Sequence, residues 1–324
     1  MINVRRIHSE DLPAFIAFPN HPESVRDDIA LYLDKMFTQG AIRQDWCFLL
    51  EVEGVMVGRL AFWTLPGSEQ ATDLVLWELP WKEKECLSLG GHFLREAFKQ
   101  MAGNLTEKIG YVLDSPSLSP QWQNDHEERR HVLAALGFRI SRETNRFEWH
   151  APVAATVLAS EEDTHDPIVY RSLPEVGEAA FVDAILRVSH FTHDQQITEE
   201  RLAKGALAQA QEMFLDLQQM KYQPEWWQLA YTAQNELIGF VMPTVSPTFA
   251  TIGYIGVLPE HRGRGYIDRL LKQATEVLVQ AGETYIRADT DVKNTPMARA
   301  FLRAGYHQFA SRQEFSLHRG LLIE

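Results

Sequence analysis

One stretch of the sequence, residues 256–271, constrains the fold most, because it combines a strand end, a glycine-rich turn and the start of a helix. Tyr254 and Val257 are aromatic and β-branched residues of the kind that strands favour. Pro259 should end the strand because it has no N–H for a sheet. After the turn, apolar residues recur at helical spacing. The sequence Arg262-Gly-Arg-Gly265 is therefore expected just before a helix N-terminus.

A glycine-rich turn at a helix N-terminus is suited to binding phosphate. The first N–H groups of a helix have no partner inside it, and the helix dipole favours an anion there. Gly263 and Gly265 would let the backbone approach a phosphate closely, while Arg262 and Arg264 add positive charge. The sequence therefore predicts a phosphate or pyrophosphate site at residues 262–265.

These residues resemble the acyl-CoA-binding motif of the GNAT acyltransferase superfamily, which reads Arg or Gln, two residues, Gly, one residue, then Gly or Ala. Arg262 and Gly265 fit this pattern, and Ile267 replaces the final small residue. A second segment downstream resembles the family's contact with the pantetheine arm; it contains Asn294, Met297, Phe301, Gly305 and Tyr306. The alternative is an unrelated α/β fold that uses glycines before a helix.

The resemblance implies acetyl-CoA, or another short acyl-CoA, as co-substrate, and it implies no metal. The residues implied to bind it are Val257, Leu258, Arg262, Gly263, Arg264, Gly265, Tyr266, Ile267, Asn294 and Phe301. In the family, N–H groups at the strand end, here near Val257 and Leu258, hold the thioester and its developing oxyanion. No cluster of His, Cys and Asp shows the spacing of metal ligands.

The residues that transfer protons do not follow from the resemblance. The family's usual Tyr acid aligns with Phe301, and its usual Glu base aligns with Thr251. The nearby catalytic candidates are Tyr254, Asp289 and Asp291. Each has an alternative interpretation, because Tyr254 suits an apolar core and the two aspartates suit a strand end or turn. A bound water could instead take the proton of the amine.

The predicted elements occur twice in the order of the GNAT fold, and residues 130–138 resemble residues 297–306. We therefore expect an α/β (α+β) protein with two tandem GNAT-like domains, each a mixed, mostly antiparallel sheet flanked by helices. The expected boundaries are 1–150 for a degenerate domain, 151–167 for a linker and 168–324 for a catalytic domain. The alternative is that residues 1–150 form an unrelated α/β domain.

The first copy lacks the glycine motif, since Trp81-Lys-Glu-Lys-Glu-Cys86 occupies the corresponding place, so we expect it not to bind CoA. In the second copy one long helix is expected over residues 198–217, beginning at Thr198.

Composition narrows the class of protein. The formal charge of −13 argues against a nucleic-acid partner, although it suits a neutral or cationic substrate or serves solubility alone. Two cysteines are too few for a disulfide framework. No apolar run approaches the roughly 20 residues of a membrane helix, and the N-terminus does not resemble a signal peptide, so a cytoplasmic protein is expected.

Together these features predict an acetyl-CoA-dependent N-acetyltransferase that acts on a small-molecule amine by direct transfer in a ternary complex. The alternative is a protein without catalytic activity that binds CoA or acyl-CoA as a sensor or scaffold.

Overall fold

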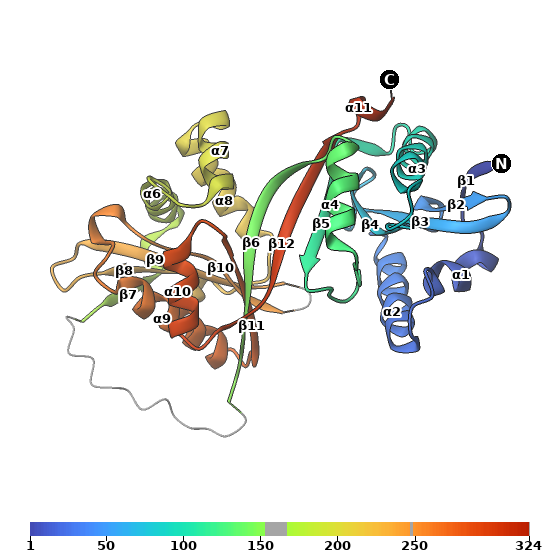
Figure 1. The fold of residues 1–324 in the computed structure, drawn as a ribbon. Coiled ribbons are helices and arrows are strands. Elements are labelled where there is room, and N and C mark those ends of the chain that lie inside the picture. The colour runs from blue at the N-terminus through green and yellow to red at the C-terminus, as the bar shows by residue number, and fades with distance from the viewer. Residues whose placement is uncertain (153–166, 247–248, 324) are drawn as a thin grey trace. The chain divides into compact units, whose positions relative to one another are not determined.

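The computed structural model describes residues 1–152, 167–246 and 249–323. They form two compact units, each a mixed sheet flanked by helices, which confirms the predicted fold class (Figure 1). Unit 1 comprises Met1–Glu143 and Arg312–Glu324, and unit 2 comprises Thr144–Ser311. No described helix is long and apolar enough to cross a membrane.

In unit 1 the strand order is β1-β2-β3-β4-β5-β12-β6. Neighbours from β1 to β4 are antiparallel, and β4 and β5 are parallel. The strands are β1 (Ile2–Arg6), β2 (Cys47–Val52), β3 (Val55–Trp63), β4 (Ala71–Glu78), β5 (Leu105–Ser115), β6 (Arg139–His150) and β12 (His307–His318). The helices are α1 (Leu12–Ala17), α2 (Glu23–Gln39), α3 (Cys86–Gln100), α4 (His126–Ala135) and α11 (Gly320–Ile323).

The two faces of the unit 1 sheet follow from the alternation of side chains along a strand. Phe48 and Leu50 of β2 belong to the core that includes α3 and α4. Cys47 and Leu49 of the same strand belong to a second core with α1 and α2. Both faces of this strand are therefore apolar, as expected for a sheet with helices on both sides.

In unit 2 the order is β12-β6-β11-β10-β9-β8-β7, with β10 and β11 parallel. Its remaining strands are β7 (Val169–Ser172), β8 (Gln228–Tyr231), β9 (Leu237–Val245), β10 (Ala250–Val257) and β11 (Tyr285–Asp291). Its helices are α5 (Leu173–Val176), α6 (Glu178–Val188), α7 (Gln195–Lys204), α8 (Ala206–Gln218), α9 (Tyr266–Gln280) and α10 (Thr295–Arg303). The prediction of one helix over 198–217 is wrong, because Gly205, at φ +89°, separates α7 from α8.

Strands β6 and β12 contribute to both units. Residues 144–150 of β6 pair with β11 inside unit 2, where Phe147 joins the core. In unit 1, Phe315 and Leu317 of β12 join the core. Each unit therefore contains a strand segment from the other half of the sequence. The linear boundaries 1–150 and 168–324 do not describe this grouping and stay a prediction, and most of the expected linker lies outside the described residues.

Candidate functional site

Strands β10 and β11 pair over two positions only and then diverge. Ala250 lies opposite Ile286 and Thr251 opposite Arg287, after which β10 pairs with β9 alone. A bulge between Thr251 and Tyr254 starts this divergence. Its glycine, Gly253, has φ +31°, and a Cβ there would lie 2.3 Å from the carbonyl oxygen of Met242. The bulge thus requires glycine and leaves one edge of β10 unpaired.

The unpaired edge of β10 presents backbone N–H groups toward the place where β11 has diverged. The N–H of Leu258 donates to Ile238 of β9 at 2.8 Å. Backbone groups alternate in direction along an antiparallel strand, so the N–H groups of Ile255 and Val257 point away from β9. The carbonyl of Val257 confirms this direction, because it accepts a hydrogen bond from Arg262 at 3.1 Å. The available donors are therefore Ile255 and Val257, and Leu258 is not one of them.

The glycine turn follows the unpaired edge directly. A short 3-10 helix, Pro259–His261, leads into Gly263 and Gly265, which have φ values of +76° and +78°. A Cβ at either glycine would meet nothing within 4 Å, so the space around the turn is open. Within the described ranges, the N–H groups of residues 263–267 donate to no protein acceptor. The turn and the first residues of α9 thus offer consecutive free donors.

The two arginines of the turn differ in their contacts. The Arg262 guanidinium donates to the backbone carbonyls of Val188, His190, Phe191 and Val257. Arg264 is exposed and makes no hydrogen bond to any residue that the structure describes. The structure thus engages Arg262 with carbonyls, where the sequence predicted a phosphate, and leaves Arg264 free to contribute charge.

Asp291, one candidate base, is buried with 2 % of its surface exposed. Its carboxylate accepts hydrogen bonds from the N–H groups of Gln195, at 3.1 Å, and Lys293, at 2.8 Å. Asp289 is exposed and lies opposite Arg146 of β6, with 3.4 Å between Asp289 Oδ1 and Arg146 Nε. Both carboxylates therefore hold local structure through partners of the same unit.

Tyr254 lies after the bulge on β10, with its ring edge-on to Phe240 at 5.0 Å between centroids. Its hydroxyl forms no hydrogen bond with the described part of the chain. Burial, followed by the nearby charge of Asp194, raises the pKa of Tyr254 above its ordinary value. The phenol therefore keeps its proton at neutral pH and remains free to donate a hydrogen bond.

The second predicted segment, residues 294–306, contains α10 together with its N-cap. The Asn294 side chain caps α10 by accepting from the N–H of Met297 at 3.3 Å. Phe301 is 2 % exposed and stacks on Phe147, with centroids 5.0 Å apart. The structure therefore places Phe301 in the core of unit 2, between α10 and the β6 segment.

Two features of unit 2 could not be predicted from the sequence. The first is the free N–H of Ile255. Pro259 marks where β10 ends, but it does not show which N–H groups of the strand point away from β9. Gln209 of α8 is fully buried, and both of its amide atoms are without a partner among the described residues. The sequence signal for this second feature is that Gln209 lies next to the apolar positions of α8, which is otherwise an amphipathic helix.

The corresponding place in unit 1 is filled by side chains of unit 1. Strands β4 and β5 also diverge, after Leu74 and Tyr111. The N–H of Leu76 then donates to the Gln121 side chain at 2.7 Å. Gln123 donates to the carbonyl of Val112 at 2.6 Å. The edges of the two diverging strands are thus occupied within the unit.

Arg129 of α4 completes this filling. Its guanidinium donates to the Trp77 carbonyl at 2.8 Å and forms a buried ion pair with Glu78 at 2.6 Å. The sequence alignment of residues 130–138 with 297–306 places Arg129 at the position of Met297 in unit 2. A charged side chain thus replaces an apolar one at this point of the repeat.

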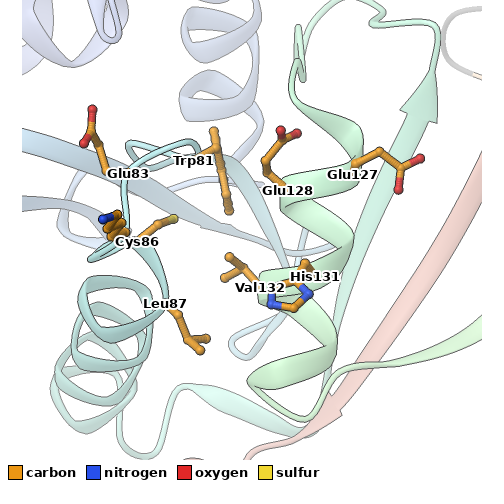
Figure 2. A pocket seen from close by; sticks show the side chains of 9 residues that line it. Trp81, Glu83, Cys86, Leu87, Glu127, Glu128, His131 and Val132 are labelled. Atoms are coloured by element: carbon orange, nitrogen blue, oxygen red, sulfur yellow. The ribbon is translucent and has the colours of Figure 1, made fainter.

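The start of α3, where unit 2 has its glycine turn at α9, borders a pocket of about 530 Å³ between α3 and α4 (Figure 2). The pocket is lined by Trp81, Glu83, Lys84, Cys86, Leu87, Glu127, Glu128, His131 and Val132. Three carboxylates against one Lys make this place unfavourable for a pyrophosphate. Unit 2 is therefore the unit whose turn suits a pyrophosphate.

Comparison with known proteins gives a family for part of the chain and a fold for nearly all of it. Residues 194–306 match the family model of the acetyltransferase (GNAT) family. A search of curated proteins found no significant match. A GCN5-related N-acetyltransferase from Sphaerobacter thermophilus has a similar structure, with a TM-score of 0.56 and 15 % identity over 98 % of this chain and 95 % of that chain.

Two further solved structures are similar at low identity. A GCN5-related glucosamine N-acetyltransferase region of a fungal multi-domain GH3 β-N-acetylglucosaminidase has a TM-score of 0.50 and 14 % identity, over 98 % of this chain and 38 % of that chain. A tandem GNAT protein from the clavulanic acid biosynthesis pathway has a TM-score of 0.44 and 13 % identity, over 98 % of both chains. Residues 194–306 are thus a domain of the acetyltransferase (GNAT) family, and the chain has the fold of GNAT acetyltransferases.

Proposed function

We propose that unit 2 transfers an acetyl group from acetyl-CoA to a small-molecule amine, directly and within a ternary complex. The observation that carries this proposal is the unpaired edge of β10, which ends in a turn with consecutive free N–H groups. An extended acyl-pantetheine arm can pair with such an edge, and a pyrophosphate can bind at such a turn. The filled counterpart in unit 1 supports one acyl-CoA site in the chain.

The residues of unit 2 have separate roles in this proposal. Gly263, Arg264, Gly265, Tyr266 and Ile267 bind the phosphates through backbone N–H groups and the charge of Arg264. The N–H groups of Ile255 and Val257 bind the pantetheine arm and the thioester oxygen. Acetyl-CoA supplies the acetyl thioester, whose C–S bond breaks as the C–N bond to the amine forms. A preorganised oxyanion donor is typically worth about 3–4 kcal/mol of barrier.

Two protons must move during the transfer. Tyr254 is the proposed donor to the leaving sulfur, because its hydroxyl has no partner in the described part of the chain; the tyrosinate then regains a proton from water. The amine proton passes to water, since Asp289 and Asp291 already have partners. Among the described residues, no three His, Cys, Asp or Glu side chains gather as metal ligands would.

The direct test is release of CoA thiol from acetyl-CoA across a panel of small amines, with Asp289→Asn and Asp291→Asn beside the wild-type protein. Turnover with at least one amine, retained in Asp289→Asn, is expected. The engaged aspartates and the buried Phe301 favour a second candidate, a sensor or scaffold without catalytic activity. That candidate predicts binding of acetyl-CoA without turnover of any amine.

A further inference from the structure

Arg262 holds two separate segments of unit 2 together. Its Nε donates to the carbonyl of Val257 at 3.1 Å, at the end of β10. Its Nη2 donates to Val188 at 2.7 Å and to His190 at 3.1 Å, and its Nη1 donates to Phe191 at 2.9 Å. The last carbonyls of a helix have no partner inside it, so one guanidinium satisfies both the end of α6 and the loop that follows.

The loop that Arg262 binds, residues 189–194, is also fastened at its far end. Asp194 caps α7 by accepting from the N–H of Ile197 at 3.0 Å. The next residue, Gln195, donates its N–H to Asp291 at the end of β11. The α6–α7 loop is thus attached to β10 through Arg262 and to β11 through Asp291, the two strands that diverge at the candidate site.

The loop carries a strained and exposed aromatic residue. Phe191 has φ +53°, a region that β-carbon-bearing residues rarely adopt, and 75 % of its surface is exposed. Its ring lies 3.9 Å from that of His190. Since the carbonyl of Phe191 is one of the four that Arg262 binds, the guanidinium stabilises this conformation.

We propose that Arg262 is a positioning residue that clamps the α6–α7 loop to the end of β10 and holds Phe191 in its strained conformation. The proposal rests on the acetyl transfer proposed above. The glycine motif alone does not predict this positioning role for Arg262. The role follows because the Arg262 guanidinium donates to four backbone carbonyls, whereas Arg264 has no such partner among the described residues and supplies charge for a phosphate.

Three variants separate a clamp from a phosphate ligand: Arg262→Ala, Arg262→Lys and, as a matched control, Arg264→Ala. The first readout is hydrogen exchange of the amides of residues 189–194 in the full-length protein without ligand. Arg262→Ala should speed this exchange by about tenfold or more, whereas Arg264→Ala should leave it unchanged. Lysine keeps the charge but cannot reach four carbonyls, so Arg262→Lys should resemble Arg262→Ala.

The second readout compares the dissociation constants of CoA and of pantetheine, which has no phosphate. A clamp predicts that Arg262→Ala changes both constants by the same factor, within about twofold, while Arg264→Ala weakens CoA by about tenfold and leaves pantetheine unchanged. With an active amine, kcat/KM of Arg262→Ala should fall by about tenfold or more, and Arg262→Lys should not restore it.

Two results together would overturn the clamp: unchanged hydrogen exchange of residues 189–194 in Arg262→Ala, and weaker binding of CoA with unchanged binding of pantetheine. They would show instead that Arg262 contacts a phosphate. Rescue of CoA affinity by Arg262→Lys would contradict it as well. If Arg262→Ala fails to fold, Arg262→Lys carries both readouts. If the wild-type protein binds neither CoA nor pantetheine, the acetyl-transfer proposal fails, whereas the exchange measurement still decides whether Arg262 clamps the loop.

Discussion

At the scale of single residues, the polar groups of the site fall into two classes: those with hydrogen-bond partners within the protein and those without. Asp291 accepts two backbone N–H groups, and Arg262 donates to four carbonyls. The Tyr254 hydroxyl and the N–H groups of residues 263–267 have no partner in the described part of the chain. We therefore expect the groups with partners to position the proposed site and the groups without partners to bind the substrates.

Tyr254→Phe tests the proposed proton donor. The change removes only the hydroxyl, so kcat should fall by about 10²-fold while the dissociation constant of CoA stays the same. Because the pKa of Tyr254 is raised, its proton is lost only as the pH rises through that higher value. Tyrosine ionisation should therefore produce no fall in kcat at neutral or mildly alkaline pH. An unchanged kcat in Tyr254→Phe would remove this residue from the mechanism.

Phe301 tests whether the position of the family's usual acid is structural here. Because its ring is buried against Phe147, Phe301→Ala should lower the free energy of unfolding by about 3–5 kcal/mol in denaturant titration. Leu302→Ala, on the exposed side of α10, is the matched control and should change it by less than about 0.5 kcal/mol. Equal effects of the two variants would contradict the packing described for α10.

At the scale of elements, local sequence signals predicted the strand end and the helix start at the glycine turn, and the structure explains where such signals failed elsewhere. The glycine turn and Pro259 correctly marked the end of β10 and the start of α9. The break at Gly205 does not follow from the sequence, because a single glycine inside an apolar periodicity does not reveal its positive φ. The divergence of β10 from β11 depends on a bulge, which is set by backbone contacts between β9 and β10 rather than by the sequence of β10 alone.

Gly256 tests how closely α6 approaches β10. A Cβ at Gly256 would lie 2.2 Å from Val188 Cγ1, at the end of the helix that Arg262 caps. Gly256→Ala should therefore lower the free energy of unfolding by about 1–3 kcal/mol. Val188→Ala removes the obstructing methyl groups. The double variant should therefore lose less free energy of unfolding than the two single variants lose together, by about 0.5–3 kcal/mol. Simple additivity in a double-mutant cycle would show that the two residues do not meet.

At the scale of the whole molecule, the repeat was visible in the sequence, but the exchange of strands was not. Strands β6 and β12 are each continuous, and nothing local in their sequences distinguishes the part in unit 1 from the part in unit 2. The grouping depends on long-range contacts, such as the ion pair of Arg312 with Asp114 and the stacking of Phe147 on Phe301. The filling of unit 1 by Gln121 and Gln123 is likewise a tertiary contact.

Removal of the last strand segment tests the exchange. A chain that ends at Ser311 lacks Phe315 and Leu317, which lie in the core of unit 1 although they come from the second half of the sequence. Its thermal unfolding should show unit 1 destabilised, since loss of one buried aromatic side chain alone costs about 3–5 kcal/mol. A chain that ends at Arg319 keeps the strand and is the control. Unfolding of the Ser311 variant that matches the control would contradict the assignment of β12 to unit 1.

The central claim is that one acyl-CoA site lies in unit 2, where the edge of β10 is open, and none in unit 1, where the corresponding edge is filled. Calorimetric titration of the full-length protein with acetyl-CoA tests this claim most directly. The account predicts saturable binding with one site per chain, which Gly265→Val should abolish because Gly265 adopts φ +78° at the turn. Two sites per chain, or no heat of binding up to about millimolar acetyl-CoA, would contradict it.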